Sequence, residues 1–594
     1  MKRVTQGKRT PPSNAEIARA LRELSLFLEM EGVQFKPRAY EKAALAIESR
    51  AGSVAELDAA GGWKALDRVP GVGKGIAGKI EELLASGHIG ELDELRAKFP
   101  IDVLALTDVE GVGAKAAKAF YESLGVRNLD DLEAACRAGR LREIPRFGAK
   151  SEAKILKALE IVRQSRGRAL LGAVLPFARE IESRLAAAGF VDSVAVAGSI
   201  RRRRETIGDL DFLVASSAPA RVMELFVGQP EVTQVLAQGE TKTMVRLANG
   251  LQADLRVIPK ESFGAALAYF TGSKAHNVAL RKLAQAKGWK LNEYGLFRGD
   301  RAIAGRTEEE LYAALGLEFV PPELREDTGE IEAAQAGELP ELVAYGSLRG
   351  DLQLQSHWSD GTSSIEELAR AARELGLEYV AITDHTRDLV LARGCDEKRL
   401  LEQKVAIARL QPRLRGIRVL SGAEVNIRED GSLDIDDETL AQLDVVGAAI
   451  HSYFHQSRAD ATRRVIRAIE NPNVDILFHP TARSIGKRAP VDFDVDAVIA
   501  AAARTGTVLE IDAMPDRLDL RDEHVRKAVG AGVKLAIDSD AHDPSHLRFA
   551  DELGVAVARR GWARASDVIN TLPLAKLQAC LKGACGRARD RAQA

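Results

Sequence analysis

The sequence is poor in cysteine and lacks a long apolar run. Its 594 residues contain four cysteines, which are scattered and form no Cys-x-x-Cys pair: Cys136, Cys395, Cys580 and Cys585. This usage fits a reducing compartment and provides no thiolate metal site. No apolar run reaches the roughly eighteen residues of a membrane span, and MKRVTQGKRT at the N-terminus has no apolar stretch after its charges. We therefore expect a cytoplasmic protein without a membrane span or a signal peptide.

An excess of charge of either sign is also missing. The net charge is −2, with 46% hydrophobic and 29% charged residues, which is ordinary for a globular protein. A near-neutral net charge would seem to argue against a nucleic-acid partner. However, a charge averaged over several domains hides local patches, so the charge must be examined segment by segment. At 594 residues the chain is too long for a single core, so we expect several domains.

Residues 1–168 have apolar residues at helical spacing and no convincing strand, which predicts an all-α region. A short pattern recurs within this region, in LDRVPGVGKGIAGKI (66–80), LTDVEGVGAKAAKAF (106–120) and LREIPRFGAKSEAKIL (141–156). Each copy reads as the end of an apolar helix, a tight turn and a small basic second helix.

The Gly-Val-Gly turns of the first two copies predict backbone N–H groups that point outward at a helix N-terminus, where a phosphate oxygen binds well. The residues concerned are Gly71, Gly73 and Lys74 in the first copy and Gly111, Gly113 and Lys115 in the second. Such a turn positions a DNA backbone without reading bases. The alternative is a glycine-rich turn between two packed helices. Two good copies and a third, which has Arg146 in the turn, favour helix-hairpin-helix DNA binding.

Short β-rich runs follow at 191–200 and 208–216. Residues two apart on a strand share a face, so Asp209 and Asp211 project together, and Asp254 lies on a third acidic strand. Three carboxylates on adjacent strands call for divalent cations, and hard oxygen ligands suit Mg²⁺ or Mn²⁺. Two such cations hold the attacking and leaving oxygens of a phosphoryl transfer. An Asp-Leu-Asp strand alone is weak evidence, but Gly198, Ser199 and the arginines at 201–204 supply donors for a nucleoside triphosphate.

GSIRRRRETIGDLD, ADLRVIP, YFTGSKAHN and LNEYGLF occur in an order and spacing that resemble the nucleotidyltransferase core of family X DNA polymerases, the DNA polymerase beta group. The resemblance implies an α+β palm and thumb and template-directed filling of short gaps in repair of the base excision type. It implies that Asp209, Asp211 and Asp254 bind the catalytic metals, with Asp254 nearest the primer 3′-hydroxyl. It also implies nucleotide contacts at Gly198, Ser199, Arg202, Tyr269, Phe270, Gly272, Asn277 and Arg281. The alternative for Tyr269 and Phe270 is a purely structural place in the core.

The first helix-hairpin-helix copy resembles the phosphate-binding hairpin of the lyase domain of the same family. The resemblance puts Lys79 where the family has the lysine that forms a Schiff base with an abasic sugar. A nucleophilic lysine must lose its proton, so burial or a neighbouring cation such as Lys74 must lower its pKa. The alternative is that Lys79 contacts phosphate as a point charge.

The last part of the chain alternates seven β-like runs with helical stretches, which predicts a parallel sheet or barrel. The runs are DLQLQSHW, EYVAITDHT, RVLSGAEVNI, DVVGAAIHS, DILFHPT, TVLEIDAM and KLAIDSDAH. Nearly every run ends in residues that bind metals: His385, Glu424, His451, His479, Asp540 and His542. The carboxyl ends of such strands meet at one rim, where a site is assembled.

These motifs resemble the polymerase and histidinol phosphatase (PHP) domain, a distorted (βα)7 barrel that hydrolyses phosphate esters with up to three metals. The resemblance implies three ligand sets: Asp360, His385 and His542; Glu424, His451 and His479; and a third with a His-x-His pair, Glu424 and Asp540. In this chain Gln353 and Gln355 replace that pair, and neutral amide oxygens hold a borderline metal such as Zn²⁺ poorly, so the expected Zn²⁺ or Mn²⁺ site is incomplete. We expect a domain with weak or no 3′–5′ exonuclease or phosphoesterase activity.

The sequence thus predicts a multidomain, monomeric DNA-directed DNA polymerase that is cytoplasmic and nucleoid-associated and acts on gapped or nicked DNA and dNTPs. The expected division is a lyase-like domain (1–88), a helical fingers-like domain (89–168), a palm (169–262), a thumb-like domain (263–325), a linker (326–346) and a PHP domain (347–594). Two alternatives stay open. One is a template-independent nucleotidyltransferase, and the other is a DNA-binding repair scaffold with a structural PHP domain.

Overall fold

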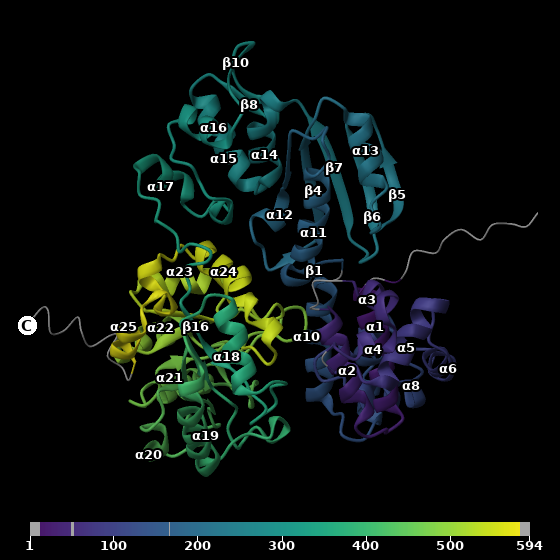
Figure 1. Cartoon of the computed structure of the whole chain (residues 1–594), viewed down its shortest axis with the longest axis vertical. Coiled ribbons are helices and arrows are strands. Elements are labelled where there is room, and N and C mark those ends of the chain that lie inside the picture. Colours follow the sequence, from purple (N-terminus) through teal and green to yellow (C-terminus); the bar gives the residue numbers. More distant parts are fainter. Residues whose placement is uncertain (1–11, 13, 49–52, 70, 166, 582–594) are drawn as a thin grey trace, which may run out of the picture.

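The computed structural model describes residues 12, 14–48, 53–69, 71–165 and 167–581. The segment on which the absence of a signal peptide was predicted, 1–10, lies outside these residues, as do Pro70 of the first repeat and Cys585. None of the helices within the described ranges has the length and apolar character needed to cross a membrane. Figure 1 shows the palm-like sheet above, with the N-terminal helices and the C-terminal barrel below it.

The N-terminal region is helical in its described residues, as predicted. Its helices are α1 (Asn14–Met30), α2 (Lys36–Glu48), α3 (Val54–Gly61), α4 (Trp63–Leu66), α5 (Lys74–Ser86), α6 (Gly90–Lys98), α7 (Val103–Thr107), α8 (Ala114–Leu124), α9 (Leu129–Arg137) and α10 (Ala149–Ser165). The side chains of Asp102 and Asn128 accept hydrogen bonds from the first turns of α7 and α9 and so fix where these helices begin. The helices enclose a core of their own, which includes Phe27 and Phe120.

The palm is a five-stranded sheet in the order β2-β4-β7-β6-β5. Its strands are β2 (Ser193–Val196), β4 (Asp209–Ala215), β5 (Val232–Gln238), β6 (Lys242–Leu247) and β7 (Gln252–Ile258), with helices α11 (Leu171–Ala186), α12 (Gly198–Arg201) and α13 (Pro219–Val227). A short pair, β1 (Ala169–Leu170) and β3 (Thr206–Ile207), joins the start of α11 to the segment before β4. The run at 191–200 is a strand only in its first half, because it ends in α12.

The thumb-like part follows β7. It contains α14 (Phe263–Thr271), α15 (Lys274–Ala286), α16 (Glu308–Leu315) and a three-stranded sheet in the order β10-β9-β8. The strands are β8 (Lys290–Asn292), β9 (Gly295–Arg298) and β10 (Arg301–Ala304). Gly264 is required here, because a Cβ on it would lie 2.2 Å from the carbonyl carbon of Thr307 at the start of α16.

The segment expected as an unpatterned linker, 326–346, contains helix α17 (Glu330–Ala336). Ile331 packs in the thumb core, and the fully buried Glu330 accepts hydrogen bonds from the backbone N–H groups of Asp327 and Thr328. Its Oε1 also lies 2.6 Å from His276 Nδ1 of α15. The segment was predicted to be a linker, but these hydrogen bonds satisfy the buried carboxylate of Glu330, and α17 packs against the thumb.

The C-terminal part is a seven-stranded parallel sheet in which every strand neighbours the next one in the sequence. The strands coincide with the seven predicted runs: β11 (Gly350–Leu354), β12 (Tyr379–Ile382), β13 (Arg418–Asn426), β14 (Val445–Ala449), β15 (Ile476–Leu477), β16 (Val508–Asp512) and β17 (Leu535–Asp538). The backbone N–H of Gln355 donates to the carbonyl of Ala541 at 2.8 Å, so the first strand and the segment after the last strand nearly close a barrel.

Helices surround this barrel: α18 (Ile365–Glu374), α19 (Glu397–Leu410), α20 (Asp437–Leu440), α21 (Arg458–Ile469), α22 (Val495–Thr505), α23 (Asp522–Gly530), α24 (Val555–Arg560) and α25 (Leu574–Cys580). Barrel and palm are in direct contact and share one hydrophobic cluster. A Cβ on Gly172 of α11 would lie 2.8 Å from Pro515 and 3.0 Å from Leu553, so glycine permits this close approach.

Candidate active sites of the palm and the barrel

The three predicted carboxylates of the palm meet on two parallel neighbouring strands. Asp209 and Asp211 begin β4, and Asp211 is in register with Asp254 of β7. Lys242 Nζ of β6 lies 3.1 Å from Asp254 Oδ2, and Gln252 Nε2 donates to Asp254 Oδ1 at 2.8 Å. Gln252 of the same strand and Lys242 of the neighbouring strand thus hold Asp254 in place, and the lysine offsets part of its charge.

The electrostatics of this cluster favour a cation. Burial, followed by the negative charges of Asp209 and Asp254, raises the pKa of Asp211 to about 6. Gly198 lies directly against the cluster, because a Cβ on it would be 2.5 Å from Asp211 Oδ2. Its φ of +62° is also a backbone conformation that suits glycine. Three carboxylates with oxygen donors and one nearby lysine fit a divalent cation of the Mg²⁺ or Mn²⁺ type.

A pocket of about 560 Å³ opens beside these carboxylates. Its lining residues are Arg168, Gly198, Ser199, Arg202, Arg204, Asp209, Asp211, Tyr269, Phe270, Gly272, Lys274, Asn277 and Arg281. All eight residues that the sequence suggested as nucleotide contacts are among them. The fold therefore brings these eight residues together from the palm and from the thumb-like part, although Gly198 and Arg281 are 83 positions apart.

The arginines at 201–204 do not all face the pocket. Arg202 lines the pocket, where its Nε donates to Glu326 Oε1 at 3.1 Å and its Nη1 donates to the carbonyl of Thr271. Arg201 is not in the lining. It donates to Glu308 of α16 at 2.6 and 2.9 Å and therefore ties the palm to the thumb. This corrects the expectation that the whole arginine run faces a triphosphate.

The two aromatic residues of α14 face the pocket rather than lying wholly in a core. Tyr269 and Phe270 stand edge to face with centroids 5.1 Å apart, and the Arg256 guanidinium lies 4.8 Å from the Phe270 centroid. Asn277 Nδ2 donates to the Tyr269 carbonyl at 2.7 Å and holds α15 against the end of α14. The pocket wall is thereby fixed by contacts between neighbouring helices.

The three copies of the N-terminal repeat share one turn geometry. The third residue of each turn has a left-handed backbone: φ is +79° at Gly71, +89° at Gly111 and +76° at Arg146. In each copy the next backbone N–H donates to a carbonyl three residues earlier, at 3.0, 2.9 and 3.1 Å. Gly73 and Gly113 then precede α5 and α8 directly. The third copy is therefore a real hairpin, with arginine in a conformation that ordinarily favours glycine.

The surroundings of Lys79 differ from those expected of a nucleophile. Its Nζ lies 3.1 Å from Glu91 and 3.5 Å from Glu82. Burial acts to lower the pKa of Lys79, but the hydrogen bond and charge of Glu91, with Glu82 and Tyr40, outweigh it and raise the pKa above its usual value. Lys74, expected as a helping cation, instead lies 5.6 Å from the Trp63 ring. The structure thus gives Lys79 counter-ions where the predicted role needs their absence.

The predicted metal ligands of the barrel converge at its rim around Glu424. Glu424 is fully buried on β13, and its Oε1 lies 2.8 Å from His451 Nε2 and 2.7 Å from His479 Nε2. Its Oε2 lies 3.4 Å from His385 Nδ1. Asp360 Oδ1 is 3.7 Å from His385 and 3.6 Å from His542. Two groups, Asp360–His385–His542 and His385–Glu424–His451, have the mutual spacing of metal ligands.

The third predicted set has other partners. Gln353 and Gln355 are fully buried, and their Nε2 atoms donate to Glu424 Oε2 at 3.1 and 2.6 Å. The remaining acid of this set, Asp540, lies 3.8 Å from the Arg517 guanidinium, which is also 3.3 Å from the buried Asp512. Gln353, Gln355 and Arg517 thus present amide and guanidinium N–H groups to Glu424 and Asp540, and an N–H group does not ligate a cation. The residues present fit two metals better than three.

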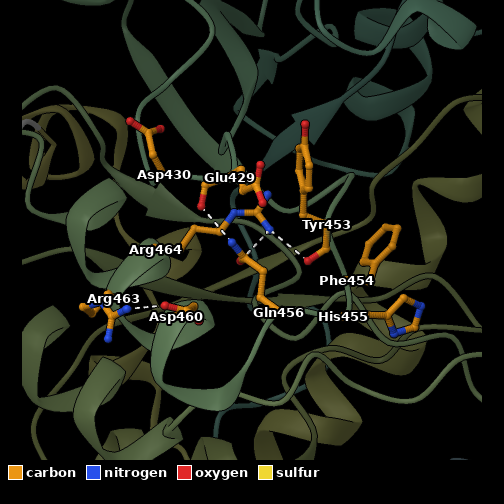
Figure 2. Close-up of a pocket in the computed structure, with 9 residues that line it drawn as sticks. All are labelled: Glu429, Asp430, Tyr453, Phe454, His455, Gln456, Asp460, Arg463 and Arg464. Atoms are coloured by element: carbon orange, nitrogen blue, oxygen red, sulfur yellow. Dashed lines mark hydrogen bonds and ion pairs between the residues drawn. The ribbon is translucent and has the colours of Figure 1, made fainter. Parts of the chain in front are cut away.

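A second pocket, of about 710 Å³, lies beside the barrel site in the loop that follows His451. Figure 2 shows the side chains of Tyr453, Phe454 and His455 on one side of it and Arg464 at its centre. Arg464 is buried and donates to the carbonyls of Arg428 and Ser452 at 2.8 and 3.0 Å. Protein groups therefore already satisfy the central cation of this pocket.

Several residues of the two sites carried no clear signal in the sequence. Lys242 and Arg517 reach their acids only through the pairing of β6 with β7 and through the loop after β16. Arg168 lines the palm pocket and donates to Thr206. The counter-ion Glu326 lies in the segment expected as a linker.

Family models match four parts of the chain: a helix-hairpin-helix domain at residues 12–89, a SAM-like helix-hairpin-helix tandem at 103–160, the DNA polymerase beta thumb at 266–326 and the PHP domain at 351–487. The tandem covers both the second repeat and the third, whose turn the structure also shows.

Individual proteins are similar over different lengths. "DNA polymerase/3'-5' exonuclease PolX" of Bacillus subtilis (strain 168) is 38% identical over 574 residues, which cover 96% of this chain and 99% of that protein. "DNA polymerase lambda" of Rattus norvegicus is 28% identical over 349 residues, 53% of this chain and 56% of that protein. A "probable phosphatase" of Thermoanaerobacter sp. (strain X514) is 32% identical over 208 residues, 32% of this chain and 78% of that protein.

Proposed function

The chain belongs to the bacterial family X DNA polymerases that combine helix-hairpin-helix repeats, a polymerase beta thumb and a C-terminal PHP domain, and we propose that it fills short gaps in DNA under the direction of a template. The enzyme is a DNA polymerase, so DNA and dNTPs are its substrates. The observation that carries the finer proposal is the pocket that joins Asp209 and Asp211 to donors from the palm and the thumb. Repair of the base excision type is the setting that suits this activity.

The roles that we propose for the pocket residues follow from their chemistry. Asp209, Asp211 and Asp254 would hold Mg²⁺ or Mn²⁺, which supplies charge stabilisation to the phosphoryl transfer when bound. Ser199 and Arg202 donate hydrogen bonds to the triphosphate, and Gly198 leaves room for it. Asp254, nearest the primer terminus, orients the 3′-hydroxyl.

The other wall of the pocket would select and position the nucleotide. Tyr269, Phe270 and Gly272 lie against its sugar, so a 2′-hydroxyl would meet this wall. Asn277 and Arg281 contact the nascent pair and the template strand. The pocket lining, which contains all five, supports these roles.

The helix-hairpin-helix turns would grip the DNA on either side of the gap. In this proposal Gly71, Gly73 and Lys74 bind the 5′-phosphate at the downstream edge of the gap. The second turn, with Gly111, Gly113 and Lys115, binds a backbone phosphate. Their outward helix N-termini and adjacent lysines support this assignment.

For the barrel we propose a two-metal PHP centre with weak 3′–5′ exonuclease activity. Asp360, His385 and His542 would hold one ion, and Glu424, His451 and His479 the other, with Zn²⁺ or Mn²⁺ as the fitting metals. Bound metals would polarise a phosphate ester and activate water. The close spacing of Asp360, His385 and His542 supports the first set. The donors around Glu424 and Asp540 argue against a third ion.

Primer extension on gapped DNA tests the polymerase proposal. We expect extension that stops at the end of the gap, needs the template strand and is faster when the downstream strand carries a 5′-phosphate, in Mg²⁺ and in Mn²⁺. Equal extension of a single strand without template would favour the template-independent nucleotidyltransferase instead. Binding without extension in either metal would favour the repair scaffold.

A further inference from the structure

Helix α24 of the barrel carries Arg560 into the polymerase half of the chain. Its side chain is 5% exposed and contacts both halves. Within the barrel, Nε and Nη2 donate to Asp522 Oδ2 at 2.9 and 2.6 Å. Toward the palm, Nη1 donates to the carbonyl of Arg202 at 2.8 Å and to Glu326 Oε1 at 3.1 Å. Arg560 thus holds both the backbone and the counter-ion of an arginine that lines the nucleotide pocket.

One carboxylate oxygen is shared among three arginines in this network. Glu326 Oε1 lies 3.1 Å from Arg202 Nε, 3.1 Å from Arg560 Nη1 and 3.8 Å from Arg204 Nη1. Glu326 is 20% exposed, so water screens these pairs only in part. Asp522 also pairs with Arg560, but all three guanidinium groups face Glu326, so the attraction of Glu326 for Arg202 depends on the other two arginines.

Two of the five N–H donors of Arg202 are engaged by the protein in this arrangement. Nε is bonded to Glu326, and Nη1 is bonded to the Thr271 carbonyl. A triphosphate binds a guanidinium through the same N–H groups, often two at a time. Glu326 and the incoming nucleotide therefore compete for Arg202. When Glu326 releases it, Arg560 and Arg204 remain as partners, so the carboxylate is not left unpaired in a partly buried place.

We propose that Glu326 is an internal competitor of the nucleotide for Arg202, and that Arg560 of the barrel sets how strongly it competes. The PHP domain then tunes nucleotide affinity through a charge contact, whether or not its own metal centre is active. This inference rests on the proposed role of Arg202 in binding the triphosphate. Glu326 and Arg560 are positioning residues, because they act through Arg202.

Steady-state extension of a gapped primer with one varied dNTP tests the proposal. Glu326→Gln removes the competing charge, so KM for the dNTP should fall about threefold to tenfold, in keeping with a partly screened ion pair. Arg560→Met leaves Glu326 to Arg202 and Arg204, so KM should rise by a similar factor. The value of kcat should change little in both, because neither residue approaches the carboxylates.

Two further variants separate this mechanism from simpler ones. In the Glu326→Gln background, Arg560→Met should have no further effect on KM, since no competitor remains to be regulated. Arg559→Met is the matched control on the same helix. Arg559 pairs with Glu323 at 2.8 Å and with the Val343 carbonyl, but not with Glu326, so its loss should leave KM near the wild-type value.

The possible failures are distinguishable. If Arg202→Ala leaves KM for the dNTP unchanged, the proposed role of Arg202 is wrong and the inference falls with it. If Arg202→Ala raises KM while Glu326→Gln has no effect, only the competition is wrong. An equal rise for Arg560→Met in both backgrounds, or the same rise for Arg559→Met, would also overturn it. Should Arg560→Met fail to fold, Glu326→Gln decides alone.

Discussion

Asp209 and Asp211 lie on one strand edge beside Asp254, and the pKa of Asp211 is raised to about 6 because these like charges add to its burial. We expect Asp209→Ala or Asp211→Ala to lower nucleotide addition by at least ~10³-fold, because each removes a metal ligand from the transition state. Binding of gapped DNA should be nearly unchanged, since the grip on the duplex lies elsewhere. Single-turnover extension and fluorescence anisotropy measure the two quantities. Extension by the double alanine variant at near the wild-type rate would refute the assignment.

In the barrel, Gln353 and Gln355 stand at two positions of the third predicted metal set, and Arg517 lies beside Asp540 of the same set. We expect the wild-type protein to bind two Mn²⁺ ions in the barrel. Gln353→His/Gln355→His should restore two ligands yet gain a third ion fully only together with Arg517→Met, which removes the repelling charge. Metal content after dialysis, by elemental analysis of protein with the palm aspartates replaced, gives the stoichiometry.

The 3′–5′ exonuclease activity of the same variants is the second measurement. Degradation of 3′ ends should rise with the third ion and fall on His451→Ala. A third ion in the wild-type barrel, or vigorous 3′–5′ degradation by the wild-type protein that His451→Ala stops, would show that the glutamines do not weaken the centre.

At the scale of elements, the turn before α5 depends on a residue with left-handed backbone. A Cβ on Gly71 would lie 3.0 Å from Lys42 and 3.2 Å from the backbone of Ala43, and its φ is +79°, so Gly71→Ala should strain the turn by about 1–2 kcal/mol. Gly73→Ala is the matched control, because alanine keeps the backbone N–H proposed to bind phosphate, nothing lies within 4 Å of its Cβ position and its φ is −84°. We expect Gly71→Ala and Lys74→Ala to weaken preferential binding of gaps with a 5′-phosphate, while Gly73→Ala keeps it.

Salt dependence tests the same element. Affinity for the phosphorylated gap should fall steeply as salt rises, because phosphate contacts release counterions. If phosphorylated and unphosphorylated gaps bind equally at every salt concentration, the turn only packs two helices.

Helix α5 also carries Lys79, whose raised pKa predicts slow Schiff-base chemistry near neutral pH. Borohydride should trap little adduct with abasic DNA at pH 7, and more as pH rises toward the raised pKa and the neutral amine becomes populated. Glu91→Gln removes the nearest carboxylate, 3.1 Å away, so it should lower the pKa and increase trapping at fixed pH. Lys79→Ala should abolish the adduct. An undiminished adduct in that variant would place the nucleophile elsewhere.

At the scale of the whole molecule, the hydrophobic clusters divide the chain differently from its sequence domains. The palm and the barrel share one cluster, whereas the N-terminal helices have their own. We therefore expect calorimetry to give one transition for palm and barrel together and a second for the N-terminal region. Gly172→Val, which would press on Pro515 and Leu553, should lower the shared transition, at a cost of about 1–3 kcal/mol.

Gly189→Val in the palm is the control for that substitution, because nothing lies within 4 Å of its Cβ position. Its effect on the shared transition should be small. Separate transitions for palm and barrel, or equal effects of the two valines, would mean that the barrel is only tethered to the polymerase.

The motifs determined much of this protein without the structure. The spacing of apolar residues predicted the all-α region, the acidic strands and the seven βα units. The sheet topology and the family matches confirm that fold class and the polymerase family. Such patterns are local, because a strand or helix buries a face that its own residues define. The exact domain bounds and the roles of single site residues stay predictions.

Tertiary structure alone decided which charges meet. Glu326 in an apparent linker, Arg560 at the end of a barrel helix and Arg202 in the palm are separated by up to 358 positions, yet they form one network. Likewise, only packing set Glu91 against Lys79 and the guanidinium beside Asp540. Sequence specifies periodicity and the identity of each charge, whereas pKa values and counter-ions depend on distances between elements, and no local pattern contains those distances.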